Sequence, residues 1–311
     1  MSTKPVNNWP ELPLVEQWED TLTTVHMWTQ IIGKIRLELS PWINHSWGST
    51  LYVTAQGLTT SSMPYNEHTL EIDFNFIDHQ LEFTTSQGSK LIIELKPMPV
   101  AEFYKITMNI LDELGVRVRI FARPVEVDTA IPFEEDFEHA SYDADAVNRF
   151  WQALVQADRV FKKFRAGFIG KSSPVHFFWG AFDLAVTRFS GRTAPKHPGG
   201  IPNCADWVMA EAYSHELSSA GFWPGTGLSE AAFYSYAYPA PDGYPKATVE
   251  PEAAFYHDSL GEFILPYSAV QSVENPDNVL LKFLQSTYEA AANTGGWDRE
   301  ALERRSLEQF K

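Results

Sequence analysis

The chain has 311 residues, of which 44% are hydrophobic and 21% charged, a composition that is typical of folded globular proteins and argues against disorder. Its 40 acidic and 24 basic residues give a formal charge of −16, which repels nucleic-acid backbones and anionic lipid surfaces. We therefore expect no nucleic acid and no membrane as partner. A local basic pocket for a small anion is still compatible with this net charge.

The start of the chain and its cysteine content predict a cytoplasmic protein. Residues 1–13 lack the basic and apolar segments of a signal peptide, and no apolar run reaches the length of a membrane span. Cys204 is the single cysteine, which excludes an internal disulfide and a zinc site of several thiolates. No nucleophile motif surrounds it, so we expect an ordinary thiol in a reducing compartment.

The first half of the chain has the pattern of a helix followed by an antiparallel meander. Apolar residues from Trp18 to Ile32 recur every three or four positions, which predicts an amphipathic helix over about residues 15–32. Alternating side chains, with turn residues between the runs, then predict strands. The expected strands cover residues 35–39, 50–54, 70–76, 81–83 and 91–95.

A second helix and a further strand complete this half. Pro99 suits the first turn of a helix, and Gly115 suits the left-handed position that ends it. Val116, Val118 and Ile120 then alternate with arginines, which predicts a strand over residues 116–120.

The second half repeats signals of the first in the same order. A helix expected at about residues 144–168 is followed by Gly-Lys, Ser-Pro and Trp-Gly pairs, as the first helix is. We interpret this order as a diverged internal duplication, the alternative being coincidence among common caps and turns. The predicted fold is α+β, with two related halves that each place helices against an antiparallel sheet. The halves cover residues 1–125 and 146–311, joined by an acidic segment at 126–145, and form one compact body with a cleft between them.

Side chains that could act in catalysis or bind a ligand are concentrated between Lys171 and Glu216. No nucleotide-binding, zinc-protease or hydrolase-elbow motif is present anywhere in the sequence. A histidine among aromatics stays neutral when buried, so it is suited to accept a proton or to bind a metal. The predicted catalytic residues are the histidines His176 and His215, together with the carboxylate of Asp183 in the same segment. A core histidine that bonds one backbone carbonyl is the alternative for His176.

Basic and aromatic side chains in the same region predict a site for an anion. Arginine forks bind carboxylate or phosphate oxygens two at a time, and the bend at Gly191 leaves room for backbone amides. The predicted ligand-binding residues are Arg188, Arg192, Lys171, Trp179 and Tyr236. The alternative is a solvated loop that only carries charge. The glycine-rich loop at residues 196–200 has the composition of a lid or of a plain connector.

A divalent metal is a further candidate cofactor. His176, His215 and Glu211 are residue types that bind such ions, although no fixed ligand spacing supports the set. Neighbouring residues on a strand point to opposite faces, so His215 and Glu216 are not expected to serve one site.

Several segments together resemble the bacterial DUF5996 family over nearly the whole chain. They are Trp9-Pro10, residues 24–30, 139–142, 173–180, 183–192 and 212–216. The resemblance implies a bacterial protein of one piece and brings no activity with it. From residue chemistry we expect a cytoplasmic enzyme that acts on a small, anionic organic molecule in an aromatic-lined cleft, with metal assistance as an option. The alternatives are a non-catalytic binding or sensing protein and a pseudo-dimer that recruits a protein partner.

Overall fold

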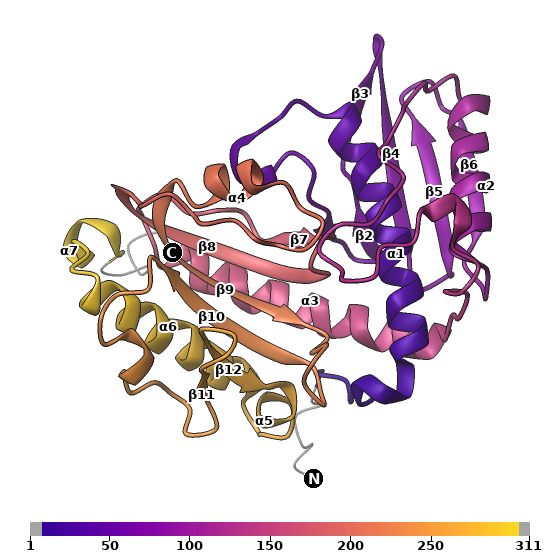
Figure 1. The fold of residues 1–311 in the computed structure, drawn as a ribbon. Coiled ribbons are helices and arrows are strands. Elements are labelled where there is room, and N and C mark those ends of the chain that lie inside the picture. Colours follow the sequence, from indigo (N-terminus) through magenta and orange to yellow (C-terminus); the bar gives the residue numbers. More distant parts are fainter. Residues whose placement is uncertain (1–7, 305–311) are drawn as a thin grey trace.

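A computed structural model describes residues 8–304 and confirms the α+β class. It holds two antiparallel sheets of six strands with helices packed against them (Figure 1). The helices are α1 (Val15–Leu39), α2 (Val100–Glu113), α3 (Ala144–Ala166), α4 (Asp206–Ala212), α5 (Tyr267–Gln271), α6 (Pro276–Thr294) and α7 (Arg299–Leu302).

The first sheet has the strand order β1-β2-β4-β5-β6, with β3 paired to β4 outside this path. Its strands are β1 (Tyr52–Val53), β2 (Gly57–Thr59), β3 (Met63–Tyr65), β4 (His68–Asn75), β5 (Gln80–Thr85) and β6 (Lys90–Glu94). The apolar residues of β4 alternate inward as expected, since Leu70, Ile72 and Phe74 are buried. The meander predicted from residue 70 onward is thereby confirmed.

The second sheet has the strand order β11-β12-β10-β9-β8-β7. Its strands are β7 (His176–Phe178), β8 (Asp183–Thr193), β9 (His215–Trp223), β10 (Ala232–Tyr238), β11 (Phe255–His257) and β12 (Glu262–Pro266). Helices α3 and α6 lie along one face of this sheet, while α4 lies over the other face (Figure 1). Side chains of one parity on β8, β9 and β10 therefore enter the core, and those of the other parity face α4.

The two sheets meet edge to edge. Leu51 and Phe177 exchange two backbone hydrogen bonds of 2.9 Å, and this bridge joins the β1 edge of one sheet to the β7 edge of the other. One continuous hydrophobic core extends through both halves, from Trp9 near the start to Ala292 in α6. The first half contains a helix, six strands and a helix in that order. The second half follows the same order from α3 to α6, with α4 inserted between β8 and β9 and the short α5 before α6, and the duplication itself stays a prediction.

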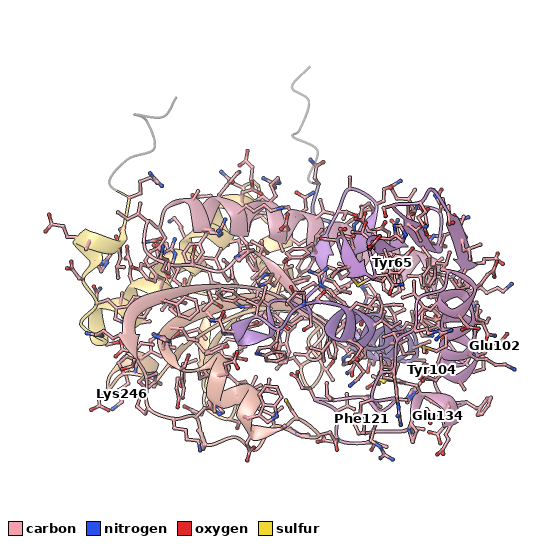
Figure 2. All side chains as sticks on the ribbon, turned by 90° about the horizontal axis from the view of Figure 1, so that it is seen from above. Tyr65, Glu102, Tyr104, Phe121, Glu134 and Lys246 are labelled. Atoms are coloured by element: carbon pink, nitrogen blue, oxygen red, sulfur yellow. The ribbon has the colours of Figure 1, made fainter. Side chains whose placement is uncertain are left out.

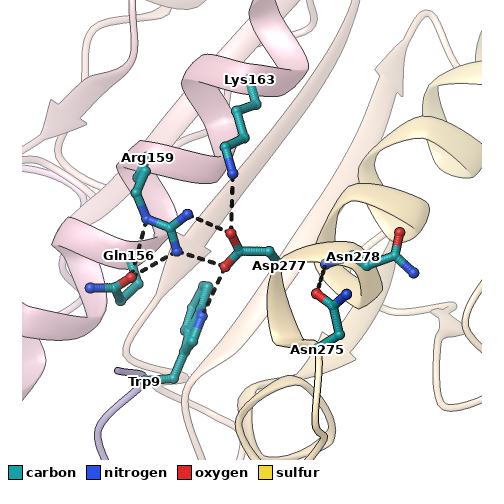
Figure 3. A network of polar contacts seen from close by, with 7 residues as sticks. All are labelled: Trp9, Gln156, Arg159, Lys163, Asn275, Asp277 and Asn278. Carbon is teal, nitrogen blue, oxygen red and sulfur yellow. Dashed lines mark hydrogen bonds and ion pairs between the residues drawn. The ribbon is translucent and has the colours of Figure 1, made fainter. Parts of the chain in front are cut away.

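Helices α3 and α6 are fastened to each other by a polar cluster on the outside of the core (Figure 3). The Asp277 carboxylate accepts two hydrogen bonds from Arg159, one from Lys163 at 3.2 Å and one from the Trp9 indole at 3.3 Å. These donors hold the pKa of Asp277 down at about 2. The cluster ties the beginning of the described chain to both helices.

Two predicted strands are wrong. Residues 35–39 continue helix α1, because Ile35 extends the same buried stripe as Ile31 and Ile32. Residues 116–120 belong to neither a helix nor a strand and pair with no strand among the described residues. The other helix boundaries agree closely with expectation, and Gly115 has the positive φ of 70° that ends α2.

No helix in residues 8–304 combines the length and the apolar character that crossing a bilayer requires.

Candidate active-site cavity

A cavity of about 290 Å³ lies on the face of the second sheet that α3 and α6 leave open. Its floor is formed by side chains of one parity from β8, β9 and β10, with Glu262 at the start of β12. The floor residues are Asp183, Ala185, Thr187, Ser219, Trp223, Tyr234, Tyr236 and Glu262. Tyr236, one of the predicted ligand-binding residues, lines the cavity, and Tyr234 lies beside it on the same face of β10.

The cover of the cavity comes from three other segments. Helix α4 and its C-terminal end supply Val208, Met209, Ala212 and Tyr213, and the preceding loop supplies Ile201. A 3₁₀ turn, η1 (Asn44–Ser46), brings His45 and Ser46 from the first half of the chain. The cavity thus joins the second sheet and α4 to a turn of the first half. The cleft between two related halves stays a prediction.

Asp183 is the most buried charged residue of the floor, with 7% of its surface exposed. The Tyr234 hydroxyl donates a hydrogen bond to Asp183 Oδ2. Burial raises the pKa of Asp183 to about 6, although this hydrogen bond acts in the opposite direction. Near neutral pH, the carboxyl can therefore exchange a proton or accept a cationic partner.

Glu126 forms part of the cavity wall and is held in place by its surroundings. Its backbone has a positive φ of 59°, and its N–H donates to the Pro202 carbonyl at 2.9 Å. The carboxylate packs on Gly180 so closely that a Cβ there would lie 2.1 Å from Glu126 Oε1. Only glycine leaves this space.

The charges around Glu126 set its protonation. Burial raises the pKa of Glu126 to about 7, and the negative charge of Asp183 adds to the rise. The ammonium of Lys34, which lies 5.6 Å from the Trp179 ring centre, acts in the opposite direction. Burial also lowers the pKa of Lys34 itself to about 8.

Glu262 is the third carboxyl group of the cavity. Burial and the charge of Asp183 together raise the pKa of Glu262 to about 8. Asp183, Glu126 and Glu262 form no ion pair with any residue in the described part of the chain. The cavity is therefore an acidic site without an internal counter-ion in direct contact.

Hydroxyl groups cover the remaining floor. The hydroxyls of Tyr213 and Tyr236 lie 2.9 Å apart, and those of Thr187 and Ser219 also lie 2.9 Å apart. Each pair joins two segments of the site, since Tyr213 follows α4 and Tyr236 belongs to β10. Such pairs offer both donors and acceptors to a ligand beside apolar ring faces.

Outside the cavity, the cover is fastened by a tryptophan. The Trp42 indole N–H donates to both carboxylate oxygens of Glu211, at 2.8 and 3.1 Å. Its ring also lies against Trp207, with the ring centres 5.1 Å apart, and both rings are largely exposed. These contacts clip α4 to the segment that carries His45.

Of the predicted catalytic residues, the cavity contains Asp183 alone. His176 lies on β7 among the rings of Trp47, Tyr52 and Phe178, with 1% of its surface exposed and no hydrogen-bond partner for Nδ1. Burial lowers the pKa of His176 to about 3, which keeps it neutral. His215 is exposed at the start of β9, where Nδ1 contacts the Ser214 hydroxyl at 3.0 Å.

The structure does not bring the two arginines together as a clamp. Arg188 is 1% exposed, lies over the rings of Phe164 and Tyr288, and donates to the Phe164 carbonyl. Its parity on β8 places it on the face opposite Asp183, Ala185 and Thr187. Arg192 binds Glu216 at 2.6 Å and the carbonyl of Gly295 at 2.6 Å.

Three other predicted residues have structural contacts away from the floor. Trp179 is buried against Gly33 and donates to the Ser49 carbonyl at 2.8 Å. Lys171 is exposed, and its backbone carbonyl accepts from Phe189. Glu211 holds Trp42 and does not meet His176 or His215; among residues 8–304, no group of three or more His, Cys, Asp or Glu side chains is arranged to hold a metal ion.

Two cavity residues, Glu126 and Glu262, were missed by sequence reasoning. Glu126 is one of many acids in the connecting segment, and nothing in its local pattern marks it as the buried one. Glu262 precedes the apolar run of β12, which is also a common position for a solvated acid. Tyr234 lies two residues before the predicted Tyr236, and alternation along a strand places both on one face, but no local signal links Tyr234 to Asp183.

The chain belongs to a family of unknown function, DUF5996, whose model matches residues 9–304. The resemblance seen in the sequence is thereby confirmed. No curated protein and no solved structure matches the chain.

Proposed function

We propose that the protein binds a small organic cation in the acidic, tyrosine-lined cavity. The observation that carries this proposal is the set of three carboxyl groups, Asp183, Glu126 and Glu262, which line one cavity without an ion pair. Each of them has a raised pKa, because ionising all three in a buried space is costly. A cationic group on a ligand would relieve that cost.

The aromatic lining supports the same class of ligand. Tyr213, Tyr234 and Tyr236 present ring faces that attract a cation, and their hydroxyls can bond its polar groups. The volume of about 290 Å³ is at the small end of ligand pockets, which favours a molecule with a single ring or a short chain.

This proposal reverses the charge of ligand expected from the sequence. The expectation of an anion rested on Arg188 and Arg192, whose guanidinium groups are occupied by carbonyls and by Glu216. The acidic floor disfavours a carboxylate or phosphate at the same place. The aromatic-lined small-molecule cleft remains part of the proposal.

Catalysis is a second candidate function, favoured by the protonation of the cavity acids. A general acid or base works best when its pKa lies near the operating pH. Glu126, with a pKa of about 7, and Asp183, with a pKa of about 6, meet this condition. If the protein is an enzyme, Asp183 and Glu126 move protons to and from a bound amine substrate. A binding or sensing protein would bind the amine without transforming it. The unpaired Cys204 is compatible with a cytoplasmic setting for either role.

A matched pair of probes tests the sign of the ligand charge. Phenethylamine and phenylacetate share a ring and differ in the charge at the end of the chain, so calorimetry with the native protein compares the two directly. We expect the amine to bind and to release protons to the buffer, because a bound cation lowers the pKa of the carboxyls. Proton release is measured as a dependence of the binding heat on the ionisation heat of the buffer.

Two variants separate the cavity from the arginine clamp. Asp183→Asn removes the central charge and should weaken amine binding by about tenfold or more. Arg192→Ala should leave the affinity for the amine unchanged. Binding of phenylacetate that is lost in Arg192→Ala would overturn the proposal and restore the anion site.

A further inference from the structure

Residues 116–122 follow helix α2 as a segment without helix or strand, and no strand pairs with it in the described chain. The sequence has the alternation of a strand: Val118 and Ile120 pack partly against the core, whereas Arg117 and Arg119 are exposed. None of the backbone amides of residues 117–122 donates a hydrogen bond within the described chain. The backbone N–H groups of this segment are thus open to a partner, whereas the carbonyls of Phe121 and Ala122 already accept from Arg123 and Phe133.

A groove runs beside this segment. It has a volume of about 770 Å³ and lies between residues 118–123 and the opposite wall of α2 and the 3₁₀ turn η2 (Phe133–Glu135). Tyr104 and Met108 of α2 give its apolar lining. Tyr104, Phe121 and Glu134 lie together at one end of the molecule, far from Lys246 at the other (Figure 2). The groove is also separate from the acidic cavity, with which it shares no lining residue.

Two exposed arginines on this segment contrast with the acidic character of the whole chain. Arg117 and Arg119 have no ion pair or side-chain hydrogen bond within residues 8–304, although the whole chain carries a formal charge of −16. Arg123 donates to the Ala130 carbonyl at 3.2 Å, and Glu134 and Glu135 lie on the opposite wall. The solvent face of the edge is therefore basic, and the far wall is acidic.

We propose that residues 117–121 are a docking edge for an extended, acidic segment of a partner protein, which adds as a β-strand. In a strand pair, residues directly opposite each other share one face, so acids of the partner would lie opposite Arg117 and Arg119. The alternate side chains of the partner would be apolar and enter the groove over Tyr104 and Met108. Main-chain bonds supply the affinity, and the arginines supply the specificity.

A second copy of the chain fits this edge poorly. Antiparallel pairing of the segment with itself around Val118 would place Arg117 opposite Arg119, and like charges opposite each other are destabilising. The large negative charge of both copies would add a long-range repulsion.

The proposal can be tested with the full chain and a labelled peptide of alternating glutamate and valine, followed by fluorescence anisotropy. A peptide of alternating lysine and valine is the matched control. We expect the wild type to bind the acidic peptide and not the lysine peptide. The double variant Arg117→Glu with Arg119→Glu should bind the acidic peptide about tenfold more weakly and should bind the lysine peptide instead. Glu102→Lys on the exposed side of α2 is a control variant that leaves the strand edge untouched.

Amide exchange distinguishes strand addition from a simple charge contact. A residue in an antiparallel pair points its N–H and C=O to the same side, so the peptide should protect alternate amides, either 117, 119 and 121 or 118 and 120. Binding without alternate protection would overturn the proposal. So would an absence of binding, an unchanged preference in the double variant, or self-association of the chain through this segment.

Discussion

The ring of Tyr234 crosses strand β9 over Gly221 and places its hydroxyl on the carboxylate of Asp183 in β8. Tyr234 pairs with Gly221, and Gly221 pairs in turn with Ala185. A Cβ on Gly221 would lie 2.3 Å from the Tyr234 hydroxyl oxygen, so only glycine lets the ring lie flat across the strand. The hydrogen bond at the centre of the cavity therefore depends on a missing side chain in the strand between its partners.

Removing that hydroxyl should destabilise the protein at high pH. In Tyr234→Phe, the Asp183 carboxylate stays buried without its donor, so we expect the pKa of Asp183 to rise above its present value of about 6. The free energy of unfolding at pH 8 should fall by about 1–3 kcal/mol, measured by urea unfolding. Tyr238→Phe is the control, since Tyr238 donates to the Pro195 carbonyl at 3.0 Å in an exposed place. Equal losses in the two variants would contradict the role of the Tyr234 bond.

The carboxyl of Glu262 should make the empty protein less stable as the pH rises. Its folded pKa of about 8 is above the ordinary value of 4.5, so the folded state keeps a proton that the unfolded chain releases. Stability from this group is present below pH 4.5 and is lost as the pH rises through 8. Glu262→Gln should match the wild type near pH 4 and exceed it by at least about 1 kcal/mol at pH 8.

The measurement is the difference in unfolding free energy between the variant and the wild type across this range. Glu67→Gln serves as control, because Glu67 is exposed in a turn of the first sheet. A difference for Glu262→Gln that stays constant with pH would show that the carboxyl is not buried with a raised pKa.

The clip between Trp42 and Glu211 should control the opening of the cavity cover. Trp42→Phe removes the indole N–H, so helix α4 loses its bond to the η1 segment. We expect faster hydrogen exchange of the amides in residues 207–213, by about fivefold, with little change in global stability. Glu211→Gln keeps a carbonyl acceptor and should stay close to the wild type. If both variants exchange alike, the indole bond does not hold the cover.

The cluster around Asp277 should contribute stability that acid removes. The folded pKa of about 2 is below the ordinary value of 3.8, so this contribution is present above pH 3.8 and is lost as the pH falls through 2. Because the ion pairs are partly exposed, we expect Asp277→Asn to cost about 1 kcal/mol at pH 7. Unfolding in urea at pH 7 and pH 3 measures the change, and a cost that grows on acidification would contradict the assignment.

The sequence predicted secondary structure best where a segment had either strand alternation or helical spacing, but not both. Leu70, Ile72 and Phe74 alternate without a helical stripe, and they form a strand. Residues 35–39 also alternate, but Ile35 continues the three- and four-residue spacing of α1, and burial of that stripe decided in favour of the helix. Residues 116–120 have the right pattern and lack a neighbouring strand, which no local pattern can reveal.

The site was predictable only in part, because its charges come from distant segments. Asp183 and Tyr236 were predicted from the residues around them in the sequence. Glu126 is positioned by packing against Gly180, which lies far along the chain, so no local pattern could identify it. Arg188 looked like a ligand for anions, and the fold instead uses it in the core over Phe164. Residue type predicts the available chemistry, while strand parity and burial decide whether it reaches the cavity.

The edge-to-edge bridge between Leu51 and Phe177 has a consequence for how the chain can be divided. It fixes the first sheet beside the second, so that the turn with His45 and the segment with Glu126 reach over the tyrosine floor. A fragment that starts at residue 146 would keep the floor and the α4 part of the cover, but it would lack His45, Ser46 and Glu126. The proposed ligand site is therefore a property of the joined chain, because neither half alone supplies all of its lining residues.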